Sequence, residues 1–201
     1  MNKGYYFLYL HGYQGSPNSI KGKKLQCWLQ KACPDAKIDA PKLPATAGEA
    51  LGVIHRHLDL ADKGQKVIIG SSLGGYMAHL CKQIRNDVNK TILINPAIRL
   101  DLIADHLEYP ALKKEAQQLL DLMPAKVDDL KDYLLLLQED DQTTPPHFAI
   151  DAFQGARIDL KHGQGHHYDN IETSFDVIED FLKLTAMRES NPRLSSNNCE
   201  K

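Results

Sequence analysis

The stretch VIIGSSLGGYMAHLC, residues 67–81, joins an apolar run to an amphipathic segment through a group of glycines and serines. Its first three residues are typical of a buried strand, and the spacing of apolar residues over 73–84 predicts a helix. Between them, Gly70, Ser72 and Gly74 fit the pattern G-x-S-x-G, in which a strand turns abruptly into a helix and leaves the serine hydroxyl exposed. Larger side chains two residues before and after the serine would collide in that turn. We therefore interpret the stretch as a nucleophile elbow with Ser72 as the nucleophile; a purely structural turn is the alternative.

Strand-like and helix-like segments alternate along the chain on both sides of this elbow. Because strands separated by helices are typically parallel and covered on both faces, the alternation predicts an α/β fold with a mainly parallel central sheet. Near-continuous apolar runs such as KVIIG and YLLLLQ fit burial on both faces. The expected strands are residues 5–10, 36–40, 67–69, 91–94, 133–138 and 156–160, and the expected helices are residues 18–32, 46–61, 73–84 and 171–184.

The chain of 201 residues is long enough for one well-buried domain, which we expect to occupy residues 1–186. Residues 99–130 carry more helical pattern than a connection between two strands needs. We interpret them either as a small lid over the site or as a long crossover. Residues 187–201 are polar and lack periodicity, so they are predicted to form a disordered tail.

Composition argues against several functional classes. Charged residues make up 25% of the chain and the net charge is −2, so nothing indicates the clustered basic surface of a nucleic-acid-binding protein. No run approaches the roughly 20 apolar residues of a membrane span, and the first apolar run is shorter than the roughly 7–15 residues of a signal peptide. The four cysteines show neither metal-ligand spacing nor the density of a disulfide scaffold. We therefore expect a cytoplasmic protein with neither nucleic-acid nor membrane partners.

A serine hydroxyl is a poor nucleophile until a base removes its proton, so the elbow requires a histidine and an orienting acid. In a parallel sheet both are expected in loops that follow later strands. The loop EDDQTTPPH, residues 139–147, supplies the acid. We favour Asp141, on a turn ahead of a helix that begins at proline. Asp140 is the near alternative, and Glu139 is a more distant one.

The loop KHGQGHHYDN, residues 161–170, supplies the base. His166 follows the flexible GQG and can reach across the top of the sheet, so we prefer it to His167 and His162. A zinc site built from these histidines and Asp169 would lack both the H-x-x-x-H helix spacing and a C-x-x-C motif. We therefore expect neither a metal nor another cofactor.

The negative oxygen that develops during acyl transfer needs fixed hydrogen-bond donors. The backbone N–H of Leu73, directly after the nucleophile, is expected to be one donor. The second is expected in the loop LHGYQGSP, as the backbone N–H of Tyr13. His11 in the same loop is interpreted as a buried residue that bonds neighbouring loops. The residues expected to bind substrate are Gly12, Gln14, Tyr76 and Tyr168.

Five motifs extend this interpretation: YLHGYQGSP, GSSLGGYMA, NPAIR, DDQTTP and GQGHHY. They are similar to the motifs of the α/β-hydrolases, and they resemble more specifically those of the small bacterial esterases of the YqiA type. The similarity spans roughly residues 5–184. It implies a compact α/β-hydrolase fold with Ser72, Asp141 and His166 as a catalytic triad that acts on short acyl esters. The chain departs from the esterase pattern by reading EDD where many relatives have a glycine before the acid, and by a second histidine in GHHY.

The function predicted from the sequence is that of a serine esterase of the carboxylesterase type. It would hydrolyse short-chain carboxylic esters, as small-molecule substrates, through an acyl-enzyme intermediate. The small size and the lack of a long lid insertion favour short acyl chains. One alternative is a thioesterase or acyltransferase with the same triad, and another is a non-catalytic α/β-hydrolase that keeps its pocket for ligand binding.

Overall fold

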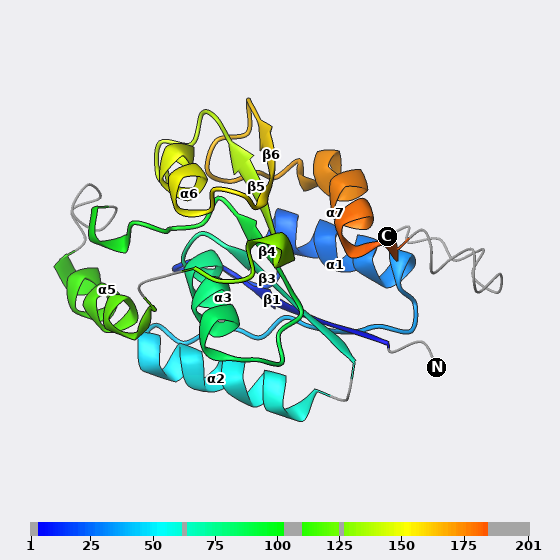
Figure 1. Ribbon diagram of the computed structural model, residues 1–201, viewed down its shortest axis with the longest axis horizontal. Helices are drawn as coiled ribbons and strands as arrows, with labels where there is room; N and C mark the ends of the chain where they lie inside the picture. The colour runs from blue at the N-terminus through cyan, green and yellow to red at the C-terminus, as the bar shows by residue number, and fades with distance from the viewer. Residues whose placement is uncertain (1–3, 62–63, 103–109, 125–126, 185–201) are drawn as a thin grey trace.

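A six-stranded sheet forms the centre of the molecule (Figure 1). The computed structural model describes residues 4–61, 64–102, 110–124 and 127–184. All neighbouring strands pair in parallel, in the order β2-β1-β3-β4-β5-β6. The predicted α/β fold with a parallel sheet is therefore confirmed. The strands are β1 (Tyr5–Leu10), β2 (Lys37–Asp39), β3 (Gln65–Ser71), β4 (Lys90–Ile94), β5 (Tyr133–Gln138) and β6 (Arg157–Lys161).

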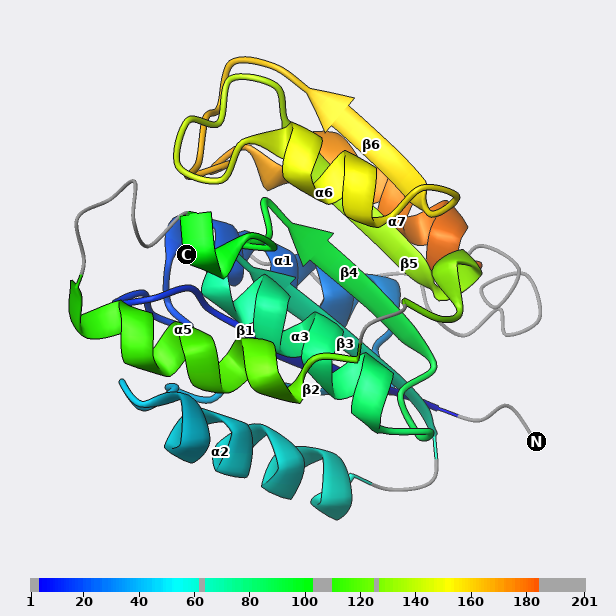
Figure 2. The same cartoon turned by 60° about the vertical axis from the view of Figure 1, so that its left-hand side comes forward.

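Helices cover both faces of the sheet, as Figure 2 shows. One face carries α2, α3, α5 and α6, and the other carries α1 and α7. Two short 3-10 turns, Leu130–Asp132 and Ile171–Ser174, precede β5 and α7. The helices are α1 (Ile20–Ala32), α2 (Ala47–Leu60), α3 (Leu73–Ile84), α5 (Pro110–Leu122), α6 (Pro146–Ala152) and α7 (Phe175–Leu182).

The strands divide the apolar core into two layers. In β5 every residue is buried, with Leu134 and Leu136 packed among the residues of α1 and α7. Leu135 and Leu137 point to the other face and pack with α3 and α6. Because successive side chains of a strand alternate between faces, a strand covered on both sides must be apolar at every position. The first five residues of the run YLLLLQ meet that requirement, and Gln138 at its end is a buried polar residue.

Two predicted elements, the helix over 73–84 and the strand over 133–138, coincide with α3 and β5. At the end of the chain, the helix predicted over 171–184 begins instead as a 3-10 turn. Its α-helical part ends at Leu182, because Lys183 adopts the left-handed conformation with φ 58°. The predicted tail, residues 187–201, lies outside the described residues.

The segment 99–130 connects β4 to β5 and contributes α5. This helix packs beside α2 and α3 on one face of the sheet (Figure 2). Residues 103–109 and 125–126 of the segment lie outside the described part of the chain. Among the residues that the structure describes, no helix is both long and apolar enough to cross a membrane.

Candidate active site

Ser72 occupies a sharp turn between the end of β3 and the start of α3. Its backbone has φ 54° and ψ −121°, a conformation that a residue with a side chain adopts only under strain. A Cβ atom at Gly70 would overlap the carbonyl oxygen of Gly74, and one at Gly74 would overlap the carbonyl oxygen of Leu10. The two glycines of the motif are therefore required by close backbone approach. The N–H of Ser72 donates to the carbonyl oxygen of Ile94 at 3.0 Å, which fixes the turn against β4.

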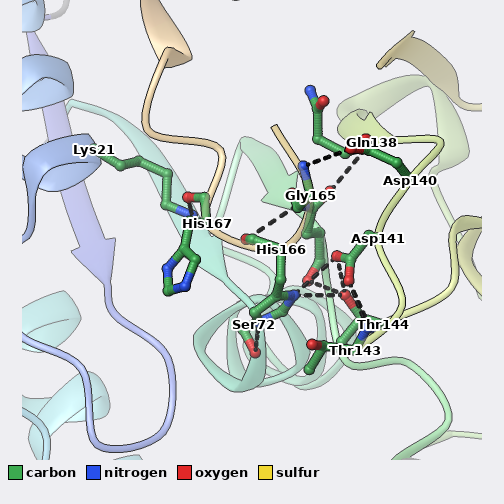
Figure 3. Close-up of polar contacts among 11 residues, drawn as sticks. Lys21, Ser72, Gln138, Asp140, Asp141, Thr143, Thr144, Gly165, His166 and His167 are labelled. Atoms are coloured by element: carbon green, nitrogen blue, oxygen red, sulfur yellow. Dashed lines mark hydrogen bonds and ion pairs between the residues drawn. The ribbon is translucent and has the colours of Figure 1, made fainter. Parts of the chain in front are cut away.

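Three side chains from separate loops meet above this turn (Figure 3). The Nε2 atom of His166 lies 3.1 Å from the Oγ of Ser72. On the other side of the ring, Nδ1 lies 2.9 Å from Oδ2 of Asp141. In the tautomer with hydrogen on Nδ1, His166 donates to Asp141 and leaves Nε2 free to accept the serine proton. This is the geometry of a nucleophile, a base and an orienting acid.

Asp141 is only 3% exposed, and its carboxylate is surrounded by hydrogen-bond donors. Its Oδ1 accepts the backbone N–H groups of Thr143 and Thr144 at 2.8 and 2.9 Å. Its Oδ2 accepts the hydroxyl of Thr144 at 2.6 Å in addition to the contact with His166. Burial by itself raises the pKa of this carboxyl, but the hydrogen bonds from His166 and Thr144 outweigh it and hold the pKa below its usual value. The carboxylate is therefore kept ionised beside the imidazole.

Asp140, the alternative acid, points to a different part of the same histidine loop. Its carboxylate accepts the backbone N–H groups of Gly163 at 3.0 Å and Gly165 at 3.2 Å. Its pKa also lies below the usual value, because these backbone hydrogen bonds outweigh the effect of desolvation. The structure thus brings Asp141, and not Asp140, to the imidazole of His166.

Asn95 and Thr144 join the site although the sequence analysis did not single them out. Asn95 has φ 42°, and its side-chain N–H2 donates to the carbonyl oxygens of Gly165 at 3.0 Å and His166 at 3.3 Å. Its Oδ1 accepts the backbone N–H of Gln138 at 2.9 Å. The hydroxyl of Thr144, besides binding Asp141, lies 3.1 Å from the carbonyl oxygen of Asn95. The signals in the sequence were the motifs NPAIR and DDQTTP, which contain Asn95 and Thr144 and come after two of the predicted strands.

The other two histidines of the loop lie away from the serine. His162 is exposed, and its Nδ1 lies 3.6 Å from Oε2 of Glu139. His167 is exposed and takes part through its backbone, since its carbonyl oxygen accepts the Nζ of Lys21 at 2.8 Å. Within the described residues, no three side chains of His, Cys, Asp or Glu gather in a way that would hold a metal ion.

A cavity of about 700 Å³ opens beside Ser72 and His166. Its walls come from the loop after β1, the segment between β2 and α2, the first turns of α2 and α3, the connection between β4 and β5 that includes α5, and the loops after β5 and β6. The lining is mainly apolar, which suits a carbon chain or ring rather than a highly charged ligand. The apolar lining residues are Leu43, Pro44, Ala45, Ala47, Leu73, Met77, Ala97, Leu100, Ala116 and Leu119.

The sequence-predicted binding residues divide into two groups. Gly12, Tyr13 and Gln14 line the cavity, and a Cβ atom added to Gly12 would lie 3.0 Å from the Cβ of Ser72. Tyr76 is buried instead in the core between α3 and α5, where its hydroxyl donates to the carbonyl oxygen of Leu119 at 3.3 Å. Tyr168 is fully buried on the opposite face of the sheet, and its hydroxyl lies 2.6 Å from that of Ser174. The expectation that these two tyrosines contact substrate is therefore corrected.

His11 binds a neighbouring loop, as the sequence analysis expected. The backbone N–H of Leu43 donates to its Nε2 at 2.9 Å, so Nδ1 carries the hydrogen and donates to the carbonyl oxygen of Gly12 at 2.8 Å. The imidazole therefore ties the loop after β1 to the segment after β2. Both loops contribute to the cavity wall.

This fold and this site define a class of protein. A parallel sheet with a serine at a strand-to-helix elbow, an acid after β5 and a histidine after β6 is the arrangement of the α/β-hydrolase superfamily, to which the protein is assigned. Solved structures with the same fold include Est1E from Butyrivibrio proteoclasticus, at a TM-score of 0.72 and 16% identity, with 92% of this chain and 90% of that chain covered. Others are the α/β hydrolase domain-containing protein 10 from mouse (TM-score 0.68, 15% identity, 89% of each chain) and the esterase Pf2001 from Pyrococcus furiosus (0.66, 15%, 90% of this chain and 82% of that one).

The sequence also matches a particular family. Residues 6–183 match the uncharacterised protein family UPF0227, so the chain belongs to that family. The match covers nearly all of the residues that the structure describes, including the loops that carry Ser72, Asp141 and His166. The α/β-hydrolase fold expected from the motifs is confirmed by the solved structures named above.

Proposed function

We propose that the protein is a serine esterase that hydrolyses carboxylic esters through an acyl-enzyme intermediate. The observation that carries the proposal is the relay from Ser72 through His166 to Asp141, with contacts of 3.1 and 2.9 Å, at the edge of an apolar cavity. Strained backbone of this kind is concentrated at active sites, and a serine facing a histidine with a buried carboxylate behind it is the arrangement of a nucleophile with its base.

In the proposed reaction, the Oγ of Ser72 attacks the ester carbonyl while Nε2 of His166 takes the serine proton. The imidazolium then gives that proton to the leaving alkoxide, and an alcohol departs. Asp141 keeps the ring in the tautomer that has hydrogen on Nδ1 and stabilises its charged form. In the second half, His166 removes a proton from water, which attacks the acyl-enzyme, and the acid product leaves as Ser72 regains its proton.

The tetrahedral intermediate would be stabilised by the backbone N–H groups of Leu73 and Tyr13. Leu73 opens α3, whose N-terminal end favours negative charge. Two features support the backbone N–H of Tyr13 as the second donor. Gly12 approaches Ser72 closely enough that a methyl group would touch it, and Tyr13 itself lines the cavity.

The acyl group is proposed to occupy the apolar part of the cavity, beside α5. The sequence favoured short acyl chains, and a volume of about 700 Å³ also leaves room for chains of several carbons. Each buried methylene contributes at most about 0.8 kcal/mol, so kcat/KM for p-nitrophenyl esters is expected to rise up to about fourfold per added carbon from acetate to hexanoate. In this proposal α5 acts as a fixed wall of the site as well as part of the crossover.

The test compares wild type with Ser72→Ala and His166→Ala on p-nitrophenyl butyrate, together with labelling by a fluorophosphonate probe. We expect both variants to lose at least about a hundredfold in kcat, and only Ser72→Ala to lose all labelling. If wild type neither hydrolyses esters nor reacts with the probe, the esterase proposal fails, and the non-catalytic binding protein becomes the better interpretation. Equal activity of Ser72→Ala and wild type would refute the nucleophile.

A further inference from the structure

The loop that carries His166 has an irregular backbone. It follows β6 and contains three residues with positive φ: Gly163 at 94°, Gly165 at 50° and Tyr168 at 47°. In such a segment few backbone groups find partners within the loop itself, so its shape depends on donors and acceptors supplied from elsewhere. The position of the His166 ring is therefore decided by the groups that bind this loop.

Partners from the sheet hold one side of the loop. Asp140 accepts two of its backbone N–H groups, and Asn95 donates to two of its carbonyl oxygens. The Oε1 of Gln138 accepts a third N–H, that of Gln164, at 3.1 Å. All of these contacts lie at or before His166, from the carboxyl ends of β4 and β5. The part of the loop after His166 has other partners, among them Gln164, which accepts the backbone N–H groups of Tyr168 and Asn170.

Two lysines of α1 hold that second part. The Nζ of Lys21 donates to the carbonyl oxygen of His167 at 2.8 Å, one residue beyond His166. The Nζ of Lys24 donates to the carbonyl oxygen of Asp169 at 2.9 Å and pairs with Glu172 at 2.7 Å. In Figure 3, Lys21 comes from α1 on the side of the loop away from Asp140 and Asp141. The backbone around His166 therefore makes hydrogen bonds on two opposite sides.

Lys21 is unusual among lysines because it is only 6% exposed. Burial lowers the pKa of its ammonium to about 8, although the negative charges of Asp169 and Asp141 act in the opposite direction. Burying an ammonium is unfavourable unless it makes a specific interaction, and lysine is almost never fully buried without a partner. The described contact of this ammonium is with the loop of the proposed base.

We propose that Lys21 is a positioning residue, which fixes the imidazole of His166 between Ser72 and Asp141 by holding the carbonyl oxygen of His167. The kinetic consequence of this proposal rests on the esterase function proposed above. Lys21 does not line the cavity, so its removal should leave substrate binding unchanged and act on the chemical step. A displacement of the reacting groups by about 1 Å is enough to cost up to about a hundredfold in rate.

The experiment compares Lys21→Met with Lys82→Met. Lys82 is a matched control because it lies near the far end of α3, its side chain is 8% exposed, and its Nζ donates to the carbonyl oxygen of Val88 at 2.9 Å. For Lys21→Met we expect kcat on p-nitrophenyl butyrate to fall about tenfold to a hundredfold with KM within twofold of wild type. For Lys82→Met we expect a lower melting temperature with kcat and KM within twofold of wild type.

A second measurement reports the position of the ring without using activity. In the proton NMR spectrum, the Nδ1 hydrogen shared by His166 and Asp141 is expected at low field, and its signal is assigned by its loss in His166→Gln. We expect this signal to be lost or broadened in Lys21→Met and retained in Lys82→Met. If the signal changes in this way while wild type hydrolyses no ester, the positioning role stands and the esterase function fails.

The proposal is overturned if Lys21→Met keeps both the NMR signal and a kcat within twofold of wild type, whatever its melting temperature. If Lys21→Met does not fold, Lys21→Gln takes its place, because its side chain stays polar but is one bond too short to keep the 2.8 Å contact with the carbonyl oxygen of His167. A loss in kcat of at least about fivefold, with unchanged KM, supports the proposal in that variant. Wild-type kcat and an unchanged NMR signal in Lys21→Gln overturn it.

Discussion

Replacing Asp141 by Asn changes a single atom and tests the proposed relay. The Oδ1 position of Asp141 accepts two backbone N–H groups, from Thr143 and Thr144, and must remain an oxygen. The NH2 group of the introduced amide would therefore occupy the Oδ2 position, which faces Nδ1 of His166 at 2.9 Å. An N–H facing Nδ1 forces the imidazole into the tautomer that has its hydrogen on Nε2.

That tautomer cannot accept the proton of Ser72, whose Oγ lies 3.1 Å from Nε2. In serine proteases the same tautomer error lowers kcat by about ten-thousandfold with the geometry intact. We expect a loss of about that size for Asp141→Asn, which corresponds to about 5 kcal/mol in the activation free energy. The hydroxyl of Thr144 can turn its lone pair to the new N–H2, so the fold and KM should change little.

The assay is steady-state hydrolysis of p-nitrophenyl butyrate, with thermal melting as a control for folding. Asp140→Asn is the matched comparison, because it alters the neighbouring acid, whose carboxylate binds only backbone N–H groups of the loop in the described contacts. We expect Asp140→Asn to lose about tenfold or less. A kcat for Asp141→Asn within about tenfold of wild type would refute the reasoning, and so would an equal loss in both variants.

Three further predictions concern the core, the loop after β1 and the cavity. Burial lowers the pKa of His79 to about 4, so below about pH 6.5 the unfolded state binds a proton that the native state lacks. The free energy of unfolding, measured by urea titration, should therefore fall by about 2 kcal/mol from pH 7 to pH 5. An equal fall in the free energy of unfolding of a His79→Gln variant would contradict this. In Gly12→Ala the new methyl would lie 3.0 Å from the Cβ of Ser72, so kcat should drop about tenfold or more at a nearly unchanged melting temperature. An unaltered kcat would count against a close approach of the loop after β1 to Ser72. Leu119→Trp on α5 should fill part of the cavity and lower kcat/KM for p-nitrophenyl hexanoate about tenfold relative to acetate, whereas an unchanged ratio would place the acyl chain elsewhere.

The elements with strong periodicity were predictable because local and global preferences agree in them. α3 begins directly after the elbow serine and is buried on all sides from Gly74 to Cys81, and β5 is buried at every position and apolar up to Leu137 because both of its faces are covered. The requirement for glycine at 70 and 74 could also be derived, since it depends only on how closely a strand and the following helix must pass.

The sequence favoured Asp141 over Asp140 but left Asp140 open as the alternative acid. Neighbouring residues on a turn point in different directions, and the direction depends on the backbone hydrogen bond from the N–H of Asp141 to the carbonyl oxygen of Gln138. Tyr76 was expected to bind substrate. Its position on α3 turns it into the core instead, where α5 covers it. That covering helix comes from a segment whose place in the fold the sequence left open.

A common backbone feature connects four residues of the loops around the site. Ser72, Asn95, Gln14 and Tyr168 all have positive φ although none is glycine, and all four lie in the loops that build or support the site. Each such conformation costs about 1–3 kcal/mol and persists only when surrounding contacts over-determine it. Asn95 shows how this works, since its strained backbone lets one side chain bind both the loop of His166 and the end of β5. Local sequence preference argues against these conformations, so sequence reading is weakest where long-range contacts hold the proposed catalytic groups in place.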